Sequence, residues 1–347
     1  MEKLLIFYLT NNDRYFIFDK FVEELNKMNN KNNIRLLIVN SNNDFNYYIN
    51  VMNNYDIDYD IQYVYCPQND YLPKVRSAIE YSKNNNFKYI MKYDNDILTP
   101  SYTFDYIYEN LFLLENENVL TLSPTITTGI PSVEYFIDDF LENDHAKIVR
   151  DEFKKCEFQI QPGIMDYTPL NNVSINSSSE WDYKEYYAYL NEYINSMSYN
   201  HNNRTYNNYC KFYKGMHPIR HGFGNDMIND YIIKNKNRFF EPKTCSIIDN
   251  DVVYLCDMFF VIKTNNYDHI INASNLLIDG CDEVPINRYA WDNNLKHLII
   301  KNGFSIHITY NWRWFLNKNV GGSNIEAPID SIECFEENFI KRLYDTN

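Results

Sequence analysis

A regular alternation of short apolar runs and amphipathic segments over the first 125 residues constrains the fold most. The apolar runs have the length and continuity of strands buried on both faces of a parallel sheet. The segments between them repeat apolar residues three or four positions apart, as helices do. This alternation predicts an α/β fold with a mostly parallel sheet flanked by helices. We expect strands at 3–9, 34–39, 61–65, 87–93 and 119–122, and helices at 18–28, 44–54, 72–82 and 101–115.

The alternation dissolves in the range 130–245, which is polar, rich in Tyr and Asn, and only weakly periodic. We interpret this range as a large irregular insertion. Beyond it, the sequence predicts a strand at 252–263, a helix at 291–301 and a strand at 304–309. Residues 329–343 space apolar side chains three or four positions apart above an acidic face, which predicts a helix packed on the domain.

The net charge of −15 disfavours non-specific binding of the whole chain to nucleic acid or anionic membrane. Its seven cysteines are scattered and include no CxxC pair, which fits reduced thiols better than a disulfide framework. No apolar run reaches the ~18 residues of a membrane span, and the first residues resemble a strand more than a signal peptide. We therefore expect a soluble, cytoplasmic protein. The abundance of Asn and Tyr, which have AT-rich codons, indicates a virus or an AT-rich microbe; a viral protein would lie in the host cytoplasm.

The run FKYIMKYDNDILTP (87–100) ends an expected strand in two acids, Asp94 and Asp96. Ligands of open parallel sheets bind beyond the carboxyl ends of the strands. Two carboxylates in positions i and i+2 can point to one side, where they repel each other unless a cation lies between them. Mg²⁺ and Mn²⁺ bind one or two carboxylates and fill their other positions with water and substrate phosphate. The pattern fits a metal–diphosphate site, and Asp-Asn-Asp equally fits a turn that caps the following helix.

With its surroundings, this run resembles the nucleotide-sugar glycosyltransferases of the GT-A fold, especially the inverting family-2-like enzymes. The segments LTNNDRYFIFDKFVEEL, IRLLIVNSNND and YLPKVRSAIEYSKNNNFKYIMKYDND carry the resemblance, which covers residues 3–125 and resumes at 252–310. It implies a D-x-D motif that holds Mn²⁺ or Mg²⁺ against the diphosphate of a nucleotide-sugar, with a UDP-sugar as the first candidate. We expect one GT-A-like catalytic domain, 1–347, made of a nucleotide-sugar-binding half (1–125), the insertion or acceptor lid (130–245), a catalytic and acceptor half (250–325) and a C-terminal helix (326–347).

The same resemblance implies which residues hold the donor. Thr10, Asn11 and Asn40 would line the nucleoside pocket, although family members often carry an aspartate where Asn40 stands. Lys74 or Arg76, in the helix before the acid-ended strand, could reach uracil or a phosphate oxygen. Both side chains also fit a solvated helix face.

A transferase of this kind needs a base that deprotonates the acceptor hydroxyl. Within the segment DGCDEVPINRYAWDNNL, the candidates are Asp282, Glu283 and Asp292. Asp292 resembles the aspartate of the family's E-D-x-x-L element, with Trp291 in place of the usual glutamate; it also fits a helix N-cap. Asp282 and Glu283 resemble an acidic dipeptide that precedes this element. The sequence does not separate the three, and Asp292 and Glu283 are the first candidates.

His307 falls in the last expected strand. Several GT-A families complete the metal shell with a histidine from this region, and an imidazole ligand would favour Mn²⁺ over Mg²⁺. A lone histidine in a strand also has a common structural role.

The stretch 204–221 is basic and aromatic, and no acid occurs between residues 193 and 225. A loop there could close over the donor phosphates with Arg220, or bind an anionic acceptor, including nucleic acid, through salt contacts and stacking. A solvated loop is the third interpretation.

The residues and the resemblance together favour a metal-dependent glycosyltransferase that acts with inversion on a glycan, a protein or a modified nucleic-acid base. A sugar-phosphate nucleotidyltransferase is the alternative within enzymes, although the segment TNNDR lacks the glycines of its phosphate loop. A non-catalytic nucleotide- or sugar-binding protein on the same scaffold is the alternative outside enzymes.

Overall fold

The computed structural model describes residues 4–10, 14–67, 71–127, 132–155, 157–159, 174–176, 224–252, 255, 258–273, 282–308 and 329–345. The chain divides into two compact units, one made of Met1–Phe136 with Lys236–Ile308 and the other of Ile137–Asn235 with Thr309–Asn347. Every predicted site residue that the structure describes belongs to the first unit. No helix in the described ranges is long and apolar enough to cross a membrane.

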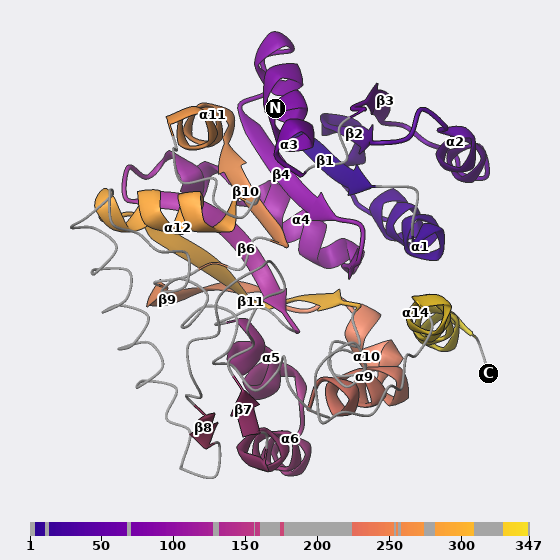
Figure 1. The fold of residues 1–347 in the computed structure, drawn as a ribbon, viewed down its shortest axis with the longest axis vertical. Helices are drawn as coiled ribbons and strands as arrows, with labels where there is room; N and C mark the ends of the chain where they lie inside the picture. Colours follow the sequence, from indigo (N-terminus) through magenta and orange to yellow (C-terminus); the bar gives the residue numbers. More distant parts are fainter. Residues whose placement is uncertain are drawn as a thin grey trace. The chain divides into compact units, whose positions relative to one another are not determined.

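The first unit is built on one nine-stranded sheet (Figure 1). Its strands are β1 (Leu4–Thr10), β2 (Ile34–Asn40), β3 (Asp60–Tyr65), β4 (Tyr89–Asp94), β5 (Ile97–Leu98), β6 (Val119–Ile126), β9 (Ser246–Val252), β10 (Phe259–Lys263) and β11 (Lys296–His307). Their order is β3-β2-β1-β4-β10-β6-β11-β5, with β9 paired to β11. Strands β1, β2, β3, β4, β6 and β11 run in one direction, and β5, β9 and β10 run against them. The predicted α/β class, with a mostly parallel sheet flanked by helices, is confirmed.

Helices cover both faces of this sheet, because successive strand residues point to opposite sides. The helices of this unit are α1 (Tyr15–Asn26), α2 (Asn46–Met52), α3 (Tyr71–Asn84), α4 (Ser101–Glu109), α10 (Lys236–Phe240), α11 (Thr264–Ala273) and α12 (Glu283–Asp292), with 3-10 turns at Lys31–Asn33 and Leu111–Glu115. Ile6 and Tyr8 of β1 pack with α1, α2 and α4 in one buried cluster. Leu5 and Phe7 pack with α3, α11 and α12 in the other.

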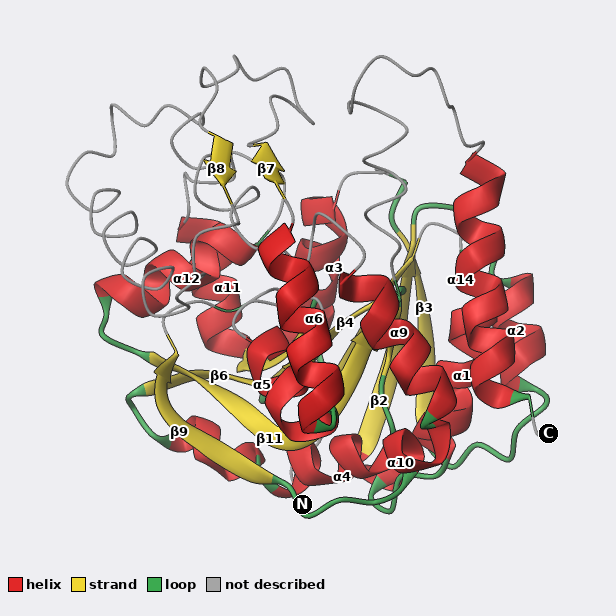
Figure 2. Cartoon of the chain, turned by 90° about the horizontal axis from the view of Figure 1, so that it is seen from below, coloured by secondary structure: helices red, strands yellow, loops and turns green. Residues whose placement is uncertain are grey.

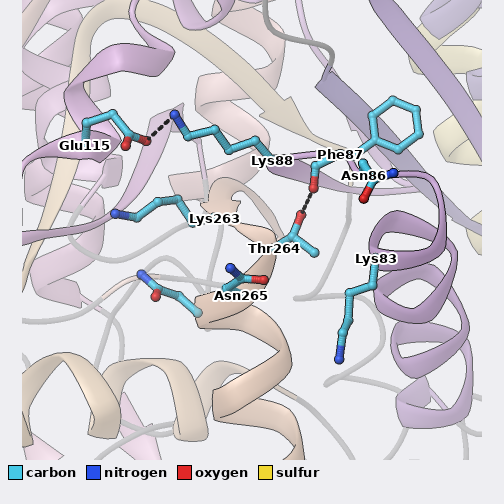
Figure 3. Close-up of a pocket in the computed structure, with 9 residues that line it drawn as sticks. Lys83, Asn86, Phe87, Lys88, Glu115, Lys263, Thr264 and Asn265 are labelled. Carbon is cyan, nitrogen blue, oxygen red and sulfur yellow. Dashed lines mark hydrogen bonds and ion pairs between the residues drawn. The ribbon is translucent and has the colours of Figure 1, made fainter.

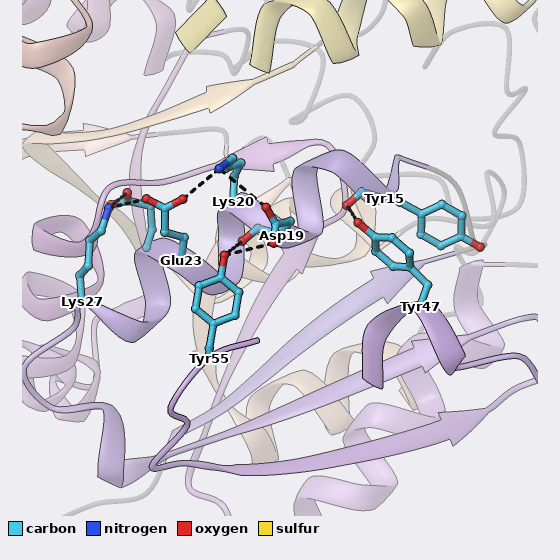
Figure 4. Close-up of polar contacts among 8 residues, drawn as sticks. Tyr15, Asp19, Lys20, Glu23, Lys27, Tyr47 and Tyr55 are labelled. Atoms are coloured by element: carbon cyan, nitrogen blue, oxygen red, sulfur yellow. Dashed lines mark hydrogen bonds and ion pairs between the residues drawn. The ribbon is translucent and has the colours of Figure 1, made fainter. Parts of the chain in front are cut away.

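Helix α1 is also tied to α2 and to the segment after it by polar contacts on the surface (Figure 4). The Tyr47 hydroxyl donates to the main-chain oxygen of Tyr15 at 2.9 Å, and the Tyr55 hydroxyl donates to Asp19 Oδ1 at 3.1 Å. Burial and the nearby charge of Asp19 raise the pKa of Tyr55, so this phenol stays a donor. These contacts fix the helix that follows β1.

The part after residue 245 departs from the prediction in two places. The expected single strand at 252–263 is two strands, β9 and β10, which occupy different positions in the sheet. The expected helix at 291–301 is wrong, since residues 296–307 form β11 between β6 and β9 (Figure 2). Leu295, Leu298 and Ile299 have helical spacing, but the buried position between two strands overrides that pattern.

Helix α12 therefore ends at Asp292 instead of beginning there. The helix ends where Asn294 adopts a left-handed conformation with φ 53°. The amide of Leu295 then donates to the carbonyl of Ala290 at 2.8 Å, as in the usual closing turn of a helix. Asn tolerates this conformation better than other residues with a side chain, so the pair Asn293-Asn294 was the available signal.

The second unit contains the helices α6 (Asn143–Lys155), α9 (Gly224–Lys234) and α14 (Ile329–Tyr344), the end of α5 (Ser132–Phe140), and the strand pair β7 (Glu157–Gln159) and β8 (Ser174–Asn176). Tyr231 of α9 packs against the rings of Phe140 and His145, with centroids 5.9 and 4.5 Å away. The predicted C-terminal helix at 329–343 corresponds to α14. The basic–aromatic stretch 204–221 lies outside the described residues.

Candidate functional site

The two acids of the D-x-D motif lie in a turn that is held from both sides. Asp94 is the last residue of β4, and the turn leads into β5, so it does not cap a helix. The amide of Asp94 donates to the carbonyl of Met258 at 3.2 Å. The amide of Ile308 donates to the carbonyl of Asp96 at 2.7 Å. The backbone of both acids is therefore fixed by the segments that enter β10 and leave β11.

A bulge in β11 aligns His307 with this turn. The pairing of β11 with β6 shifts register between Ile300 and Phe304. Asn302 has φ 61° there, and a Cβ on Gly303 would lie only 2.6 Å from the Ile300 side chain. Beyond the bulge, His307 pairs with Ile97 of β5, next to Asp96.

Asp96 is the centre of a half-buried polar cluster. Arg14 Nη1 donates to Asp96 Oδ2 at 3.0 Å, and His307 Nε2 lies 3.2 Å from the same oxygen. Burial alone would raise the pKa of Asp96, but the charges of His307 and Arg14 hold it well below its usual range. Asp96 is therefore an anion at the carboxyl end of β4.

Asp94 contacts a different cation, Lys92. The Lys92 side chain is fully buried, and its Nζ lies 3.1 Å from Asp94 Oδ1 and 3.2 Å from Oδ2. The rings of Tyr71 and Phe260 lie beneath the ammonium, with centroids 5.0 and 5.9 Å away. Buried lysines are rare unless they are paired, so the carboxylate and the rings together compensate its desolvation.

The structure brings Glu283 to this cluster. Glu283 is the first residue of α12 and is buried. Burial raises its pKa well above the usual range; the charge of Lys92 opposes this rise and that of Asp94 adds to it. The preceding residue, Asp282, accepts from the Tyr71 hydroxyl, and the Tyr71 ring lies 5.0 Å from Lys92 Nζ, so the start of α12 lies beside the Lys92–Asp94 pair. Glu283 is thus a buried carboxyl that favours the protonated form beside the acid turn.

Asp282 links helices through hydrogen bonds to two tyrosines. Its Oδ1 accepts from the Tyr71 hydroxyl at 2.5 Å, and its Oδ2 accepts from the Tyr267 hydroxyl. These phenols come from α3 and α11, while Asp282 immediately precedes α12. One buried carboxylate therefore joins the three helices that cover this face of the sheet, and both of its oxygens have tyrosine donors.

Asp292 lies at the other end of α12 from Glu283. Its side chain is exposed, and it is the last residue of the helix rather than the N-cap suggested by the sequence. Nine residues of helical rise put the two backbones roughly 13 Å apart. Glu283 and Asp292 therefore occupy different places along α12.

The predicted donor residues are found at the ends of β1 and β2, and several have internal partners. The Thr10 hydroxyl shares a hydrogen bond of 2.6 Å with the Tyr48 hydroxyl. Lys74 is buried, and its Nζ donates to the carbonyl of Thr10 at 3.3 Å, so it does not lie on a solvated helix face. The Asn40 side chain donates to the Asp44 carbonyl at 3.3 Å, which shapes the loop after β2. Arg76 is exposed on α3, and Asn11 and Arg220 lie outside the described residues.

Asp96 and His307 have the chemistry and spacing of two neighbouring metal ligands. Two adjacent ligands of an octahedral ion with bonds of about 2.1 Å lie roughly 3.0 Å apart, and the measured separation of the two atoms is 3.2 Å. A carboxylate with an imidazole suits Mn²⁺. Across the described part of the chain, no group of three or more His, Cys, Asp or Glu side chains forms a ready metal cage. The residues fit an ion that takes its remaining ligands from water or substrate.

A pocket of about 590 Å³ lies at the opposite end of β4 (Figure 3). Lys88 and Lys263 line it together with Glu115, which pairs with Lys88 at 3.2 Å. The Thr264 hydroxyl closes one wall by donating to the Phe87 carbonyl at 2.7 Å. None of the predicted site residues lines this pocket. The carboxyl ends of the strands, where the acids gather, remain the candidate site.

Sequence reasoning missed two cations and two phenols of the site: Arg14, Lys92, Tyr71 and Tyr267. The available signal for Lys92 was a charge inside an otherwise apolar strand, which demands a partner. Arg14 lies immediately before α1, in the segment after β1, and has a left-handed backbone with φ 52°. Tyr71 gave no signal, because its partner Asp282 lies 211 residues further along the chain.

Comparisons with known proteins give partial structural similarity. No protein-family model and no curated protein sequence matches the chain. A mannosyltransferase from Pyrobaculum calidifontis, in complex with GDP-Man and Mn²⁺, is similar over 36 % of this chain and 36 % of its own, with 13 % identity and a TM-score of 0.31. TarS (residues 1–349) of S. aureus, in complex with UDP-GlcNAc, is similar over 36 % and 34 %, with 12 % identity and a TM-score of 0.29. A cytidylyltransferase from Leptospira borgpetersenii is similar over 35 % and 52 %, with 16 % identity and a TM-score of 0.27.

The matched part of the chain spans between about a third and a half of the length of these three proteins. One is a mannosyltransferase, one is a cytidylyltransferase, and TarS is described in complex with UDP-GlcNAc. What they bind is a property of those proteins, and the likeness at these TM-scores is limited to part of the fold.

Proposed function

We propose that the chain is a metal-dependent glycosyltransferase that moves a sugar from a nucleotide-sugar to an acceptor hydroxyl. One observation carries the proposal: Asp96 Oδ2 and His307 Nε2 face each other at 3.2 Å beyond the carboxyl end of β4. Ligands of open α/β sheets bind at this edge. A carboxylate and an imidazole side by side there suit a divalent cation that meets a diphosphate.

Asp96 and His307 would hold Mn²⁺ or Mg²⁺. Asp94, which pairs with Lys92, would be the second carboxylate of the motif. The cation would supply charge that stabilises the leaving nucleoside diphosphate. Arg14, whose guanidinium already contacts Asp96, would act on the same phosphate oxygens. Fixed charges of this kind lower the barrier because they need no reorganisation during the reaction.

Glu283 is the base that the geometry supports best. It lies near the acid turn, whereas Asp292 is exposed at the far end of α12 and Asp282 accepts hydrogen bonds from two tyrosines. A base works best when its pKa approaches the operating pH, and burial moves Glu283 in that direction. Attack by the acceptor oxygen on the anomeric carbon would expel the diphosphate and invert that carbon.

The donor would extend from the acid turn along the ends of β1 and β2. Thr10 and Asn40 lie at those ends, and Lys74 reaches the carbonyl of Thr10. We propose a UDP-sugar as the first donor to test, with a GDP-sugar next. The acceptor would be a glycan, a protein or a modified nucleic-acid base.

The experiment is a panel of nucleotide-sugars, tested for release of the nucleoside diphosphate by the full chain with Mn²⁺ and with EDTA. We expect release with at least one donor, dependence on the metal, and loss of about 100-fold or more in Asp96→Asn. Glu115→Gln, at the opposite end of β4, is the matched control and should keep full activity. Release of pyrophosphate from a nucleoside triphosphate and a sugar phosphate would instead identify a nucleotidyltransferase.

A further inference from the structure

The pocket at the opposite end of β4 from the acid turn has a positively charged lining (Figure 3). Its described lining contains three lysines, Lys83, Lys88 and Lys263, and one acid, Glu115, although the whole chain has a net charge of −15. We propose that this pocket binds a small sugar-like molecule that carries a phosphate group. Such a ligand would be distinct from the nucleotide-sugar donor at the acid turn, so the site goes beyond the proposed function.

On one side of the pocket, the ammonium groups of Lys88 and Lys263 act on a single carboxylate, that of Glu115 (Figure 3). Lys88 Nζ lies 3.2 Å from Glu115 Oε1, and the Tyr89 hydroxyl donates to the same oxygen at 2.7 Å. This hydrogen bond from Tyr89, together with the two lysine charges, lowers the pKa of Glu115 and keeps it an anion. One carboxylate balances one ammonium, so this side of the pocket has one positive charge in excess.

Lys263 carries this excess charge. Lys83, the third lysine of the lining, pairs with the carboxylate of Asp268. By contrast, within the described part of the chain the Lys263 side chain makes no hydrogen bond or ion pair. It is half-buried at the end of β10, so water stabilises its charge only in part. A phosphate group would give this ammonium an anionic partner, and lysine is a frequent phosphate ligand.

Three asparagines, Asn86, Asn265 and Asn266, add neutral hydrogen-bonding groups to the lining. Their side chains make no hydrogen bond to the residues that the structure describes. Each amide offers two N–H donors and one carbonyl acceptor, which match the hydroxyls of a sugar, since these both donate and accept. Phe87 adds little apolar surface, because its side chain is buried and its ring stacks on that of Tyr81. The lining therefore favours a polar ligand over an apolar one.

The size and the walls of the pocket suit one small molecule. Its volume of about 590 Å³ falls within the range of about 300–1,000 Å³ that is usual for such sites. The Thr264 hydroxyl donates to the Phe87 carbonyl at 2.7 Å, and the Thr264 amide donates to the Lys88 carbonyl at 2.9 Å, so the wall between β4 and α11 is already formed. Six residues of strand separate Lys88 from Asp94, or roughly 20 Å. A molecule of this size at Lys88 therefore does not reach the acid turn.

The test measures binding of glucose 6-phosphate, glucose and inorganic phosphate to the full chain by isothermal titration calorimetry, with EDTA present to remove divalent ions. We expect glucose 6-phosphate to bind about tenfold or more tightly than either of the other two, because only it meets both the lysine and the asparagines. Lys263→Gln should weaken this binding about tenfold or more. Lys147→Gln, at an exposed position of α6, removes the same charge elsewhere and should bind as the unaltered chain does. Glu115→Gln should tighten binding several-fold, because it frees Lys88 from its carboxylate.

Four results would overturn the proposed site. These are the absence of saturable binding of glucose 6-phosphate, equal affinities of Lys263→Gln and Lys147→Gln, and unchanged or weaker binding in Glu115→Gln. The fourth is binding that is lost in Arg14→Gln and kept in Lys263→Gln, since the phosphate would then occupy the acid turn. Inorganic phosphate that binds as tightly as glucose 6-phosphate would exclude the sugar-like part of the ligand. None of these measurements depends on sugar transfer, so the failure of this site and the failure of the proposed function are distinct.

Discussion

Asp94 and Asp96 are separated by one residue, and their carboxylates contact different cations. Asp94 Oδ1 lies 3.1 Å from Lys92 Nζ on the same strand, whereas Asp96 Oδ2 lies 3.0 Å from Arg14 Nη1 and 3.2 Å from His307 Nε2. Asp94 thus stays attached to β4, and Asp96 connects the turn to the end of β11 and to the start of α1. Asp96, together with His307, is therefore the candidate metal ligand of the motif. Asp94 instead neutralises Lys92.

Removing either partner of the Lys92–Asp94 pair alone should strongly lower the free energy of unfolding. Asp94→Asn leaves a buried ammonium without its carboxylate, and breaking such a pair costs about 3–5 kcal/mol. The double variant Lys92→Met with Asp94→Asn should recover most of that loss, because no uncompensated charge remains. Urea unfolding of the two single variants and the double variant measures the coupling. Additive losses would show that the pair does not interact as the structure indicates.

The roles of Glu283 and Asp292 can be distinguished by replacing each carboxylate with the corresponding amide. Glu283→Gln should lower turnover about 100-fold or more with donor affinity nearly unchanged, because it removes the base and keeps the shape. Asp292→Asn, on the exposed end of the same helix, should change turnover less than twofold. Steady-state kinetics with donor and acceptor varied separately give both values. A large loss in Asp292→Asn with a normal Glu283→Gln enzyme would transfer the role to Asp292.

The hydrogen bonds of Asp282 with Tyr71 and Tyr267 should stabilise the fold, because they link α3, α11 and α12. Asp282→Asn replaces one acceptor with an amide group that faces a tyrosine hydroxyl, and a buried mismatch of this kind costs about 1–3 kcal/mol. Tyr267→Phe, which removes a single donor, should also lower the free energy of unfolding. Asp268→Asn breaks an exposed ion pair and should change it by about 0.5 kcal/mol or less. Equal stability of Asp282→Asn and Asp268→Asn would contradict this role of Asp282.

His297 predicts a dependence of stability on pH. Its ring is buried in β11 with Nδ1 2.8 Å from the Thr121 hydroxyl oxygen, and burial lowers the pKa of His297 to about 3. The unfolded chain, with a histidine pKa of about 6.5, binds the proton more readily. Stability is therefore fully present above about pH 6.5 and falls as the pH drops towards 3, by at most about 1.4 kcal/mol per pH unit.

His297→Gln should lose this dependence. We expect its free energy of unfolding to fall less steeply than that of the unaltered chain between about pH 6.5 and pH 4, above the range in which most carboxylates titrate. Urea unfolding at four pH values across that interval measures both slopes. Parallel slopes would mean that His297 does not carry the effect.

Much of the first half of the fold could be predicted from local patterns. Strands such as Ile34–Asn40 and helices such as Tyr71–Asn84 combine apolar continuity or helical spacing with clear polar boundaries, so local and tertiary preferences agree. After residue 245 they conflict. Residues 296–301 have a helix-like spacing of apolar side chains, and pairing with two neighbouring strands decides for a strand. Such pairing involves residues far apart in the chain and leaves no local signal.

The site was predictable to a similar extent. The acids at the end of a buried strand and the later His307 could be named from position and residue type, and the structure places Asp96 and His307 in contact. The cations opposite them could not be assigned, because Arg14 reaches Asp96 across 82 residues of chain. Lys92 was visible in the sequence as a charge within an apolar strand. Its partner could be identified only when the backbone set the direction of both side chains.

The central claim is that Asp96 and His307 together hold a divalent cation against a diphosphate. The most direct measurement is the anomalous scattering of manganese in crystals of the full chain grown with Mn²⁺ and UDP. The account predicts one manganese peak within about 2.2 Å of both Asp96 Oδ2 and His307 Nε2, with phosphate oxygens in its remaining positions. A peak bound elsewhere, or UDP bound at the end of β4 with no manganese between it and these two residues, would contradict the claim.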